Sequence, residues 1–199
     1  EDFNIKNYIA RGELKKINFI FKKFEFKNTE FKFFADNSDI LLKDIKSEID
    51  GVVFNNGDLQ INYEKNINIK SSFFTSLDLN RKQHSTYFKL LEKNKDLKGN
   101  IRLNADLDHN LDITFDKTMK VNDYNYVNKG KIKELFYQTN DKDNKFLLNQ
   151  NIKKLKIENS EINTGFNSDS NNYIISSGNY KLNDLTLDKY SITSKIKKN

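Results

Sequence analysis

The stretch that decides the fold reads GNIRLNADLDHNLDITF over residues 99–115. Apolar residues recur there at every second position in two runs, from Ile101 to Leu107 and from Leu111 to Phe115, with polar residues between them. Alternation with period two is the pattern of a β-strand with one apolar face and one wet face. This stretch therefore predicts amphipathic strand structure.

The same alternation recurs along the whole chain. The further runs are Ile17, Phe19, Phe21; Phe24, Phe26; Phe31, Phe33; Leu59, Ile61, Tyr63; Ile67, Ile69, Phe73; Ile132, Phe136; Leu155, Ile157; Tyr173, Ile175; Tyr180, Leu182; and Tyr190, Ile192, Ile196. Parallel strands buried on both sides would read as continuous apolar runs, so the pattern predicts an antiparallel or meandering sheet with one wet face. The helical spacing of Tyr87, Leu90 and Leu91 predicts one short helix over residues 81–94.

Glycine and asparagine mark the expected turns. We expect turns at residues 36–39, 55–57, 140–144 and 167–172, which are rich in Asn, Asp, Ser and Gly. Gly12, Gly57, Gly99, Gly130 and Gly178 each stand before a polar and then an apolar residue, which is a weak internal repeat. The pattern indicates a turn glycine with positive φ, followed at once by a strand.

The composition limits the class of protein. The chain of 199 residues is long enough to bury an apolar surface, and its 16 Phe and 9 Tyr are residues that disordered chains lack. The net charge of +6 is dispersed, with no run of more than two Lys or Arg, so it is weak evidence for a nucleic-acid partner. The lack of cysteine excludes a disulfide framework and a cysteine-based zinc site.

The best candidate for a metal site is the acidic run from Asp106 through Asp108 and Asn110 to Asp112. Its first half resembles a calcium loop, but Leu111 and Lys117 stand where the loop needs Gly and a bidentate Glu. In a strand these side chains share the solvent face, so we expect a solvated stripe and no metal. His84 and His109 are the only histidines; we expect both at the surface, and we expect neither catalysis nor a cofactor.

Three functional interpretations stay open at this point. Aromatic residues interleaved with lysine over residues 19–34 are compatible with base stacking, although alternation places Phe and Lys on opposite sides. Two sheets packed face to face would give a compact structural module. One long curled sheet would instead leave an open apolar groove, for which acyl chains are the natural filling.

The chain resembles the AsmA/TamB-type repeats of bridge-like envelope proteins. The resemblance is carried by the glycine-initiated amphipathic strands, above all by residues 55–61, residues 99–107 and the Gly-Lys-Ile-Lys segment at Gly130, and it extends in texture over residues 5–196. It implies a long curled antiparallel sheet shaped like a taco, which conducts phospholipids between the inner and outer membranes. It also implies a periplasmic location and an inner-membrane anchor outside the segment.

The resulting expectation treats residues 1–199 as a single segment of a repetitive β-groove, cut from a larger protein and carrying a helical insertion at residues 81–94. The expected partners are phospholipid acyl chains, and the two membranes through other parts of the protein, but no nucleic acid. The alternative is a structural or adhesive β-module of a surface protein without a lipid ligand. The residues expected to line the groove are Phe19, Phe21, Phe33, Ile61, Ile69, Phe73, Leu103, Leu107, Ile113 and Ile132.

Overall fold

The computed structural model describes residues 7–21, 24–63, 66–80, 99–139, 152–169, 171–183 and 185–196. These residues form ten β-strands. The strands are β1 (Ile9–Phe21), β2 (Phe24–Asp36), β3 (Asp39–Ile49), β4 (Val52–Asn62), β5 (Ile67–Asn80), β6 (Asn100–Phe115), β7 (Val121–Gln138), β8 (Lys154–Asn167), β9 (Asn172–Leu182) and β10 (Asp188–Ile196).

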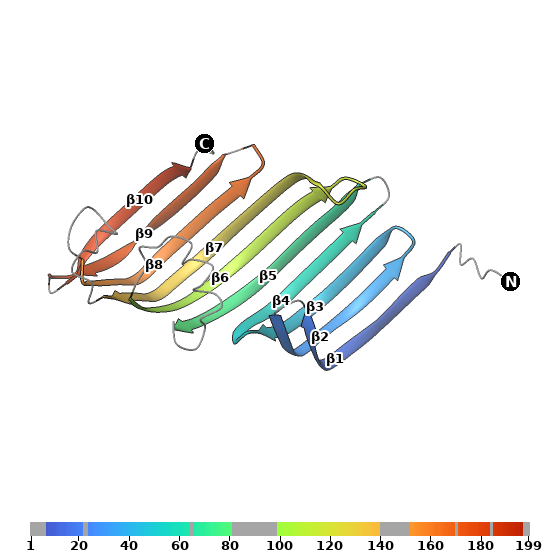
Figure 1. Ribbon diagram of the computed structural model, residues 1–199, viewed down its shortest axis with the longest axis horizontal. Helices are drawn as coiled ribbons and strands as arrows, with labels where there is room; N and C mark the ends of the chain where they lie inside the picture. Colours follow the sequence, from blue (N-terminus) through green and yellow to red (C-terminus); the bar gives the residue numbers. More distant parts are fainter. Residues whose placement is uncertain are drawn as a thin grey trace.

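All ten strands belong to one sheet, and their spatial order is the same as their order along the chain. Each strand pairs antiparallel with the next, so the sheet is a continuous meander (Figure 1). β1 and β10 form the two edges, far apart from each other. The expectation of an all-β antiparallel meander is therefore confirmed.

The sheet has two chemically different faces. We define the inner face as the side of the sheet that carries the odd-numbered residues of β6, from Ile101 to Phe115. The outer face is the opposite side. Cross-strand partners lie on the same face, so the register carries this division from β1 to β10. The inward positions of β1 to β9 hold no Asp, Glu, Lys or Arg among the described residues.

Charged side chains gather on the outer face, where neighbouring strands exchange ion pairs. Lys32 on β2 lies 2.7 Å from Asp44 on β3, and Lys133 on β7 lies 2.6 Å from Asp106 on β6. Ser76 on β5 also donates a hydrogen bond of 2.7 Å to Asp106. These groups are largely exposed, so they contribute little stability and keep the outer face wet.

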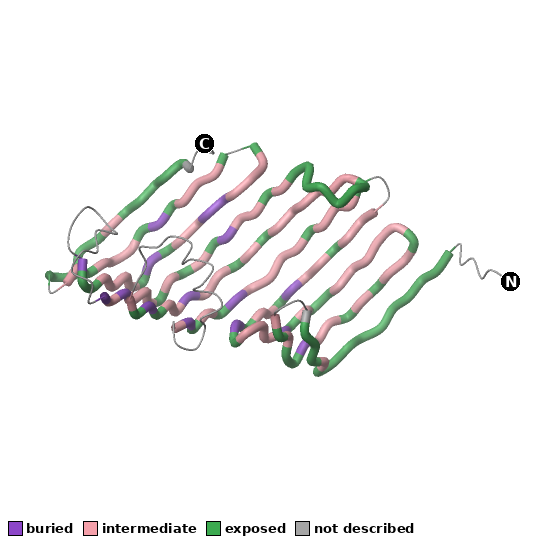
Figure 2. The backbone as a smooth tube through the Cα atoms, in the orientation of Figure 1, coloured by how far each residue is buried: buried purple, intermediate pink, exposed green. Residues whose placement is uncertain are grey.

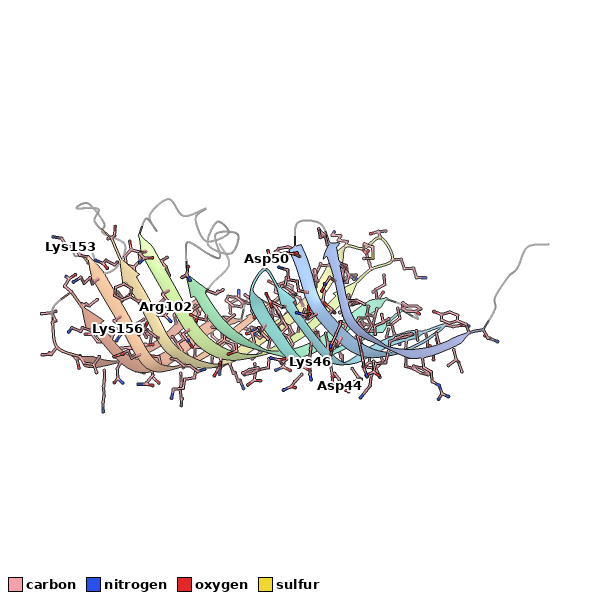
Figure 3. The ribbon with its side chains drawn as sticks, turned by 90° about the horizontal axis from the view of Figure 1, so that it is seen from below. Asp44, Lys46, Asp50, Arg102, Lys153 and Lys156 are labelled. Carbon is pink, nitrogen blue, oxygen red and sulfur yellow. The ribbon has the colours of Figure 1, made fainter. Side chains whose placement is uncertain are left out.

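β-bulges bend the strands. Lys16, Asn28, Asp44, Asn56 and Asn159 have positive φ between 48° and 56°, and each lies at a break in the register of its strand. An extra residue in one strand of a pair bends that strand and increases its twist. Figure 3 shows the strands bending in one direction, with Asp44 and Lys46 on the convex side. The inner face is thus the concave side.

Among the described residues, a cluster of buried apolar side chains occurs at one end of the central strands β4 to β7. Val52, Leu79, Ile101 and Tyr137, from four adjacent strands, are buried together, with Phe54 and other half-buried residues packed against them. Elsewhere on the inner face most apolar residues are half-buried, and Figure 2 shows buried residues only as short separate pieces. The described residues therefore form a single layer without a second layer packed across it.

The expectations about curl, helix and turns have different outcomes. The sheet is open and is not strongly curled, so the expected taco-like curl is not confirmed. The predicted helix over residues 81–94 lies outside the described residues, as does the predicted turn at 140–144. The turns at 36–39 and 167–172 are confirmed, because they connect β2 to β3 and β8 to β9.

At four of its five positions the glycine repeat has a different cause from the expected one; Gly99, with positive φ, does directly precede a strand. Gly12, Gly57, Gly130 and Gly178 lie within strands and face inward, not in turns. A Cβ at Gly57 would lie 2.8 Å from the Cβ of Ile45, and one at Gly12 would lie 2.7 Å from the ring of Phe33. Gly12 and Gly57 thus make room for a large side chain on the neighbouring strand, whereas Gly130 lies against the backbone of Asp106 and Leu107 and Gly178 lies against Ser160. The predicted turn at 55–57 is a bulge within β4.

Three predicted inward residues point the other way. A bulge at Lys133 shifts the register of β7, so Leu135 and Tyr137 face inward and Phe136 faces outward. On β9 the inward residues are Ile174 and Ser176, which leaves Tyr173 and Ile175 on the outer face. In both cases apolar residues at consecutive positions, residues 135–136 on β7 and residues 173–175 on β9, made the alternation ambiguous.

Candidate functional site

The ten residues predicted to line a groove lie on one face. Following the register from β1 to β7 places all of them on the inner face. They are Phe19 and Phe21 on β1, Phe33 on β2, Ile61 on β4, Ile69 and Phe73 on β5, Leu103, Leu107 and Ile113 on β6, and Ile132 on β7. The register brings Ile61, Ile69 and Ile113 side by side across three strands. Whether the ten residues contact lipid stays a prediction.

The inner face is hollowed between β1 and β5. A concavity of about 250 Å³ is lined there by side chains that are almost all apolar. The lining comprises Phe19, Phe26, Thr29, Phe31, Leu42, Ile45, Ser47, Ile49, Phe54, Gly57, Leu59, Ser71 and Phe73. We call this concavity the β1–β5 hollow.

Small residues make the depth of the β1–β5 hollow. Thr29, Ser47 and Gly57 belong to its floor and are buried. The hydroxyls of Thr29 and Ser47 bond to each other at 2.8 Å, so their polarity is satisfied within the wall. The larger lining residues stand around them, and Phe19 and Phe26 stack with ring centroids 4.5 Å apart. The hollow therefore presents mainly hydrocarbon and ring surface.

A ladder of rings crosses the inner face from β4 to β8. Phe54, Phe73, His109, Tyr126 and Phe166 follow one another on adjacent strands, with centroid separations of 5.5, 4.5, 6.0 and 6.4 Å. Cross-strand aromatic pairs at these distances stabilise a sheet beyond the area they bury. We call these five residues the ring ladder; it continues the β1–β5 hollow toward β8.

His109 was expected at the surface, but it lies half-buried in the middle of the ring ladder. Its ring stacks on Phe73 at 4.5 Å with an interplanar angle of 11°. Its Nε2 lies 2.8 Å from Oγ1 of Thr75, and its Nδ1 lies 2.7 Å from Oη of Tyr126 and 3.0 Å from Nδ2 of Asn128. Burial lowers the pKa of His109 below its ordinary value, so the ring is neutral near pH 7.

The sequence contained the signal that places His109. Leu107 and Leu111, two positions away on either side, were predicted to point away from the solvent, and alternation alone puts His109 with them. The expectation of a surface histidine came from the residue type and overrode the position. The lining residues that the sequence did not reveal are Phe26, Phe31, Phe54 and Tyr126. Each lies at even spacing from a predicted lining residue or on a strand adjacent to one.

The acidic run behaves as a solvated stripe. Asp106, Asp108, Asn110 and Asp112 all face outward on β6, and Asp106 and Asp112 pair with Lys133 and Lys70. The Lys133 ammonium and the Ser76 hydroxyl hold the pKa of the Asp106 carboxyl below its usual range. Within the described ranges no group of three His, Cys, Asp or Glu side chains is arranged to hold a metal ion.

Comparison with family models, curated proteins and solved structures finds no match to this chain. In the part of the chain that the structure describes, no helix has the length and apolar character needed to cross a membrane. The function is therefore inferred from the chemistry of the two faces.

Proposed function

We propose that the inner face is a non-enzymatic binding surface for the acyl chains of lipids. The observation that carries this proposal is the combination of an apolar, uncharged inner face with a single-layer sheet. A face of this size with exposed apolar side chains, such as Phe19 at 41% and Ile192 at 51% exposure, is unfavourable in water and marks a binding surface.

Shape and chemistry favour acyl chains over a flat protein partner. The bulges make the face concave along the strands, and the β1–β5 hollow deepens it where Thr29, Ser47 and Gly57 replace larger side chains. The inward positions of β1 to β9 offer no ion-pair partner, so the ligand part in contact with them is uncharged. A flexible hydrocarbon chain meets both conditions.

The wider role in this proposal is passage of phospholipids between the inner and outer membranes of a bacterial envelope, with the segment in the periplasm. Its support is the resemblance of the strand motifs at residues 55–61 and 99–107 to AsmA/TamB-type repeats. An inner face without charged side chains from β1 to β9 suits such passage, because a chain moving along it meets no charge on these strands.

Native mass spectrometry of the protein purified from membranes tests the binding proposal. Wild type is expected to carry phospholipid, and Ile113→Arg is expected to lose most of it, because a guanidinium beside an acyl chain is poorly solvated. Asn110→Arg is the matched control: it puts the same charge on the same strand but on the exposed outer face, and should retain the lipid. Circular dichroism checks that both variants fold.

Two results would overturn the proposal. One is a wild-type protein that leaves the membrane fraction without bound lipid. The other is equal lipid binding by folded Ile113→Arg and Asn110→Arg. Either result favours a structural β-module whose inner face is covered by protein.

A further inference from the structure

His109 is the one imidazole on the described inner face, in a region without any other readily titrating side chain. On β5 it faces Thr75 and Phe73, and on β7 it faces Tyr126 and Asn128, with Tyr124 next along that strand. The inward residues of β8 near the ring ladder are Thr164 and Phe166. The nearest carboxylate along β6, Asp108, lies on the outer face.

The hydrogen bonds around the ring select its neutral form. The side-chain nitrogen of Asn128 can only donate, so Nδ1 of His109 accepts a hydrogen bond from it. Nε2 then carries the proton and donates to Oγ1 of Thr75. Thr75 and Asn128 are 3% and 6% exposed, so neither can turn to water or to a ligand without opening the wall.

Protonation of His109 conflicts with this arrangement. A proton on Nδ1 would point toward Asn128 and Tyr126, where one donor already lies 3.0 Å away. The cation would also lie within an uncharged face, stacked on Phe73, with the charge of Asp108 on the far side of the sheet. Proton uptake therefore turns the Asn128 amide from a bonded donor into a repelled one, leaves the Tyr126 hydroxyl to accept from Nδ1, and removes apolar character at the centre of the ring ladder.

We propose that His109, together with Thr75, Tyr126 and Asn128, is a proton-sensitive switch that weakens acyl-chain binding on the inner face when the pH falls. The inference builds on the proposed function and adds its regulation. An acyl chain laid over the ring removes water from it and so disfavours the imidazolium further. By linkage, protonation must then lower the affinity for the chain, by about tenfold for each unit by which bound ligand depresses the His109 pKa.

Protonation of His109 is also expected to lower the stability of the free protein. Burial lowers the pKa of His109 below the value it has in the unfolded chain. The contribution of His109 therefore favours the folded state above about pH 6.5, and it is lost as the pH falls and the unfolded chain takes up the proton first. A weakening of the fold and a weakening of ligand binding are expected over the same range, below about pH 6.5.

The test uses an uncharged probe, a pyrene-labelled monoacylglycerol, whose own charge does not change between pH 7.5 and 5.0. Wild type should bind it several-fold to tenfold more weakly at pH 5.0 than at pH 7.5. His109→Gln keeps a neutral hydrogen-bonding side chain and should show less than a twofold change. His84→Asn, at the other histidine of the sequence, should keep the wild-type dependence.

Direct titration of the His109 imidazole by NMR, assigned with the two histidine variants, separates the possible outcomes. A probe that binds at pH 7.5 with the same pH dependence in wild type and His109→Gln overturns the switch but leaves the proposed function intact. A probe that binds at neither pH contradicts the proposed function. In that case, an imidazole pKa at or above about 6.5 also overturns the switch, whereas a lowered pKa with reduced thermal stability at pH 5.0 upholds proton sensing by the cluster.

Discussion

The first four strands and the central pair β5–β6 share one alternating pattern, but they differ in the regularity of their pairing. β1, β2, β3 and β4 each contain a residue with positive φ, at Lys16, Asn28, Asp44 and Asn56, and their register shifts at these points. β5 and β6 pair through fourteen consecutive residues, from Ile67 opposite Phe115 to Asn80 opposite Arg102, without a shift.

The difference shows what shapes the inner face. In the bulged strands the residue after the bulge turns inward, and large and small side chains then fit together across strands, as Ile45 does over Gly57. In the unbulged pair the inward residues simply alternate along straight ladders. The bulged half therefore contains the β1–β5 hollow, while β5 and β6 supply the middle of the ring ladder.

The largest expected effect comes from filling the space under Ile45. Gly57→Val would place a Cβ 2.8 Å from the Cβ of Ile45 and 3.1 Å from its carbonyl oxygen, so the bulged half must shift. We expect a loss of about 2 kcal/mol in the free energy of unfolding, measured by urea denaturation. Ser72→Val, on the outer face of unbulged β5, is the control and should lose no stability, because Val suits a strand.

The double variant Gly57→Val with Ile45→Gly sharpens this prediction. Ile45→Gly removes the Cβ and Cγ2 atoms that the new Cβ would meet, so part of the lost stability should return even though Ile45→Gly alone is destabilising. Strictly additive losses would mean that close packing of Ile45 over Gly57 does not determine the shape of the bulged half.

The next effect concerns the hydroxyl pair in the floor of the hollow. Thr29→Val removes one partner of the buried 2.8 Å bond and leaves the Ser47 hydroxyl unpaired, so we expect a loss of about 1–2 kcal/mol in the free energy of unfolding. Thr29→Val with Ser47→Ala removes both hydroxyls and should recover much of that loss. If the double variant is no more stable than Thr29→Val, the hydroxyl pair has no such role.

The smallest effect compares glycine at a bulge with glycine in a straight strand. Lys16 has φ of 55°, which is unfavourable for a residue with a Cβ, so Lys16→Gly should raise the free energy of unfolding by about 0.5 to 1 kcal/mol. Ser72→Gly on β5 should lower it by about the same amount, because strand glycine costs conformational entropy. Equal signs for the two variants, read from thermal melts, would contradict the assignment of backbone strain to the bulge.

Much of the fold could be predicted from the sequence, because alternation directly reports which face a side chain occupies. It placed all ten proposed lining residues on one face, and it identified the sheet as antiparallel. Where the alternation was interrupted, prediction failed. The Asn55, Asn56 and Gly57 segment has the composition of a hairpin turn, and only the pairing of β4 with both neighbours shows it to be a bulge.

The candidate site was harder to predict for two physical reasons. A bulge such as that at Lys133 shifts the alternation by one residue, so Phe136 was assigned to the wrong face. The cluster of His109 with Thr75, Tyr126 and Asn128 depends on cross-strand register over three strands, which the sequence does not specify. The β1–β5 hollow likewise depends on the alignment of small residues from separate strands.

The most direct test of the central claim is site-specific photocrosslinking in the producing cells. A photoreactive residue at Leu111 on the inner face should form adducts with phospholipid, while the same residue at Asn110, its exposed neighbour on the outer face, should not. Mass spectrometry of the purified protein reads out both positions. Lipid adducts confined to Leu111 are the predicted result; protein adducts at Leu111, or equal lipid labelling at both positions, would contradict the claim that the inner face binds acyl chains.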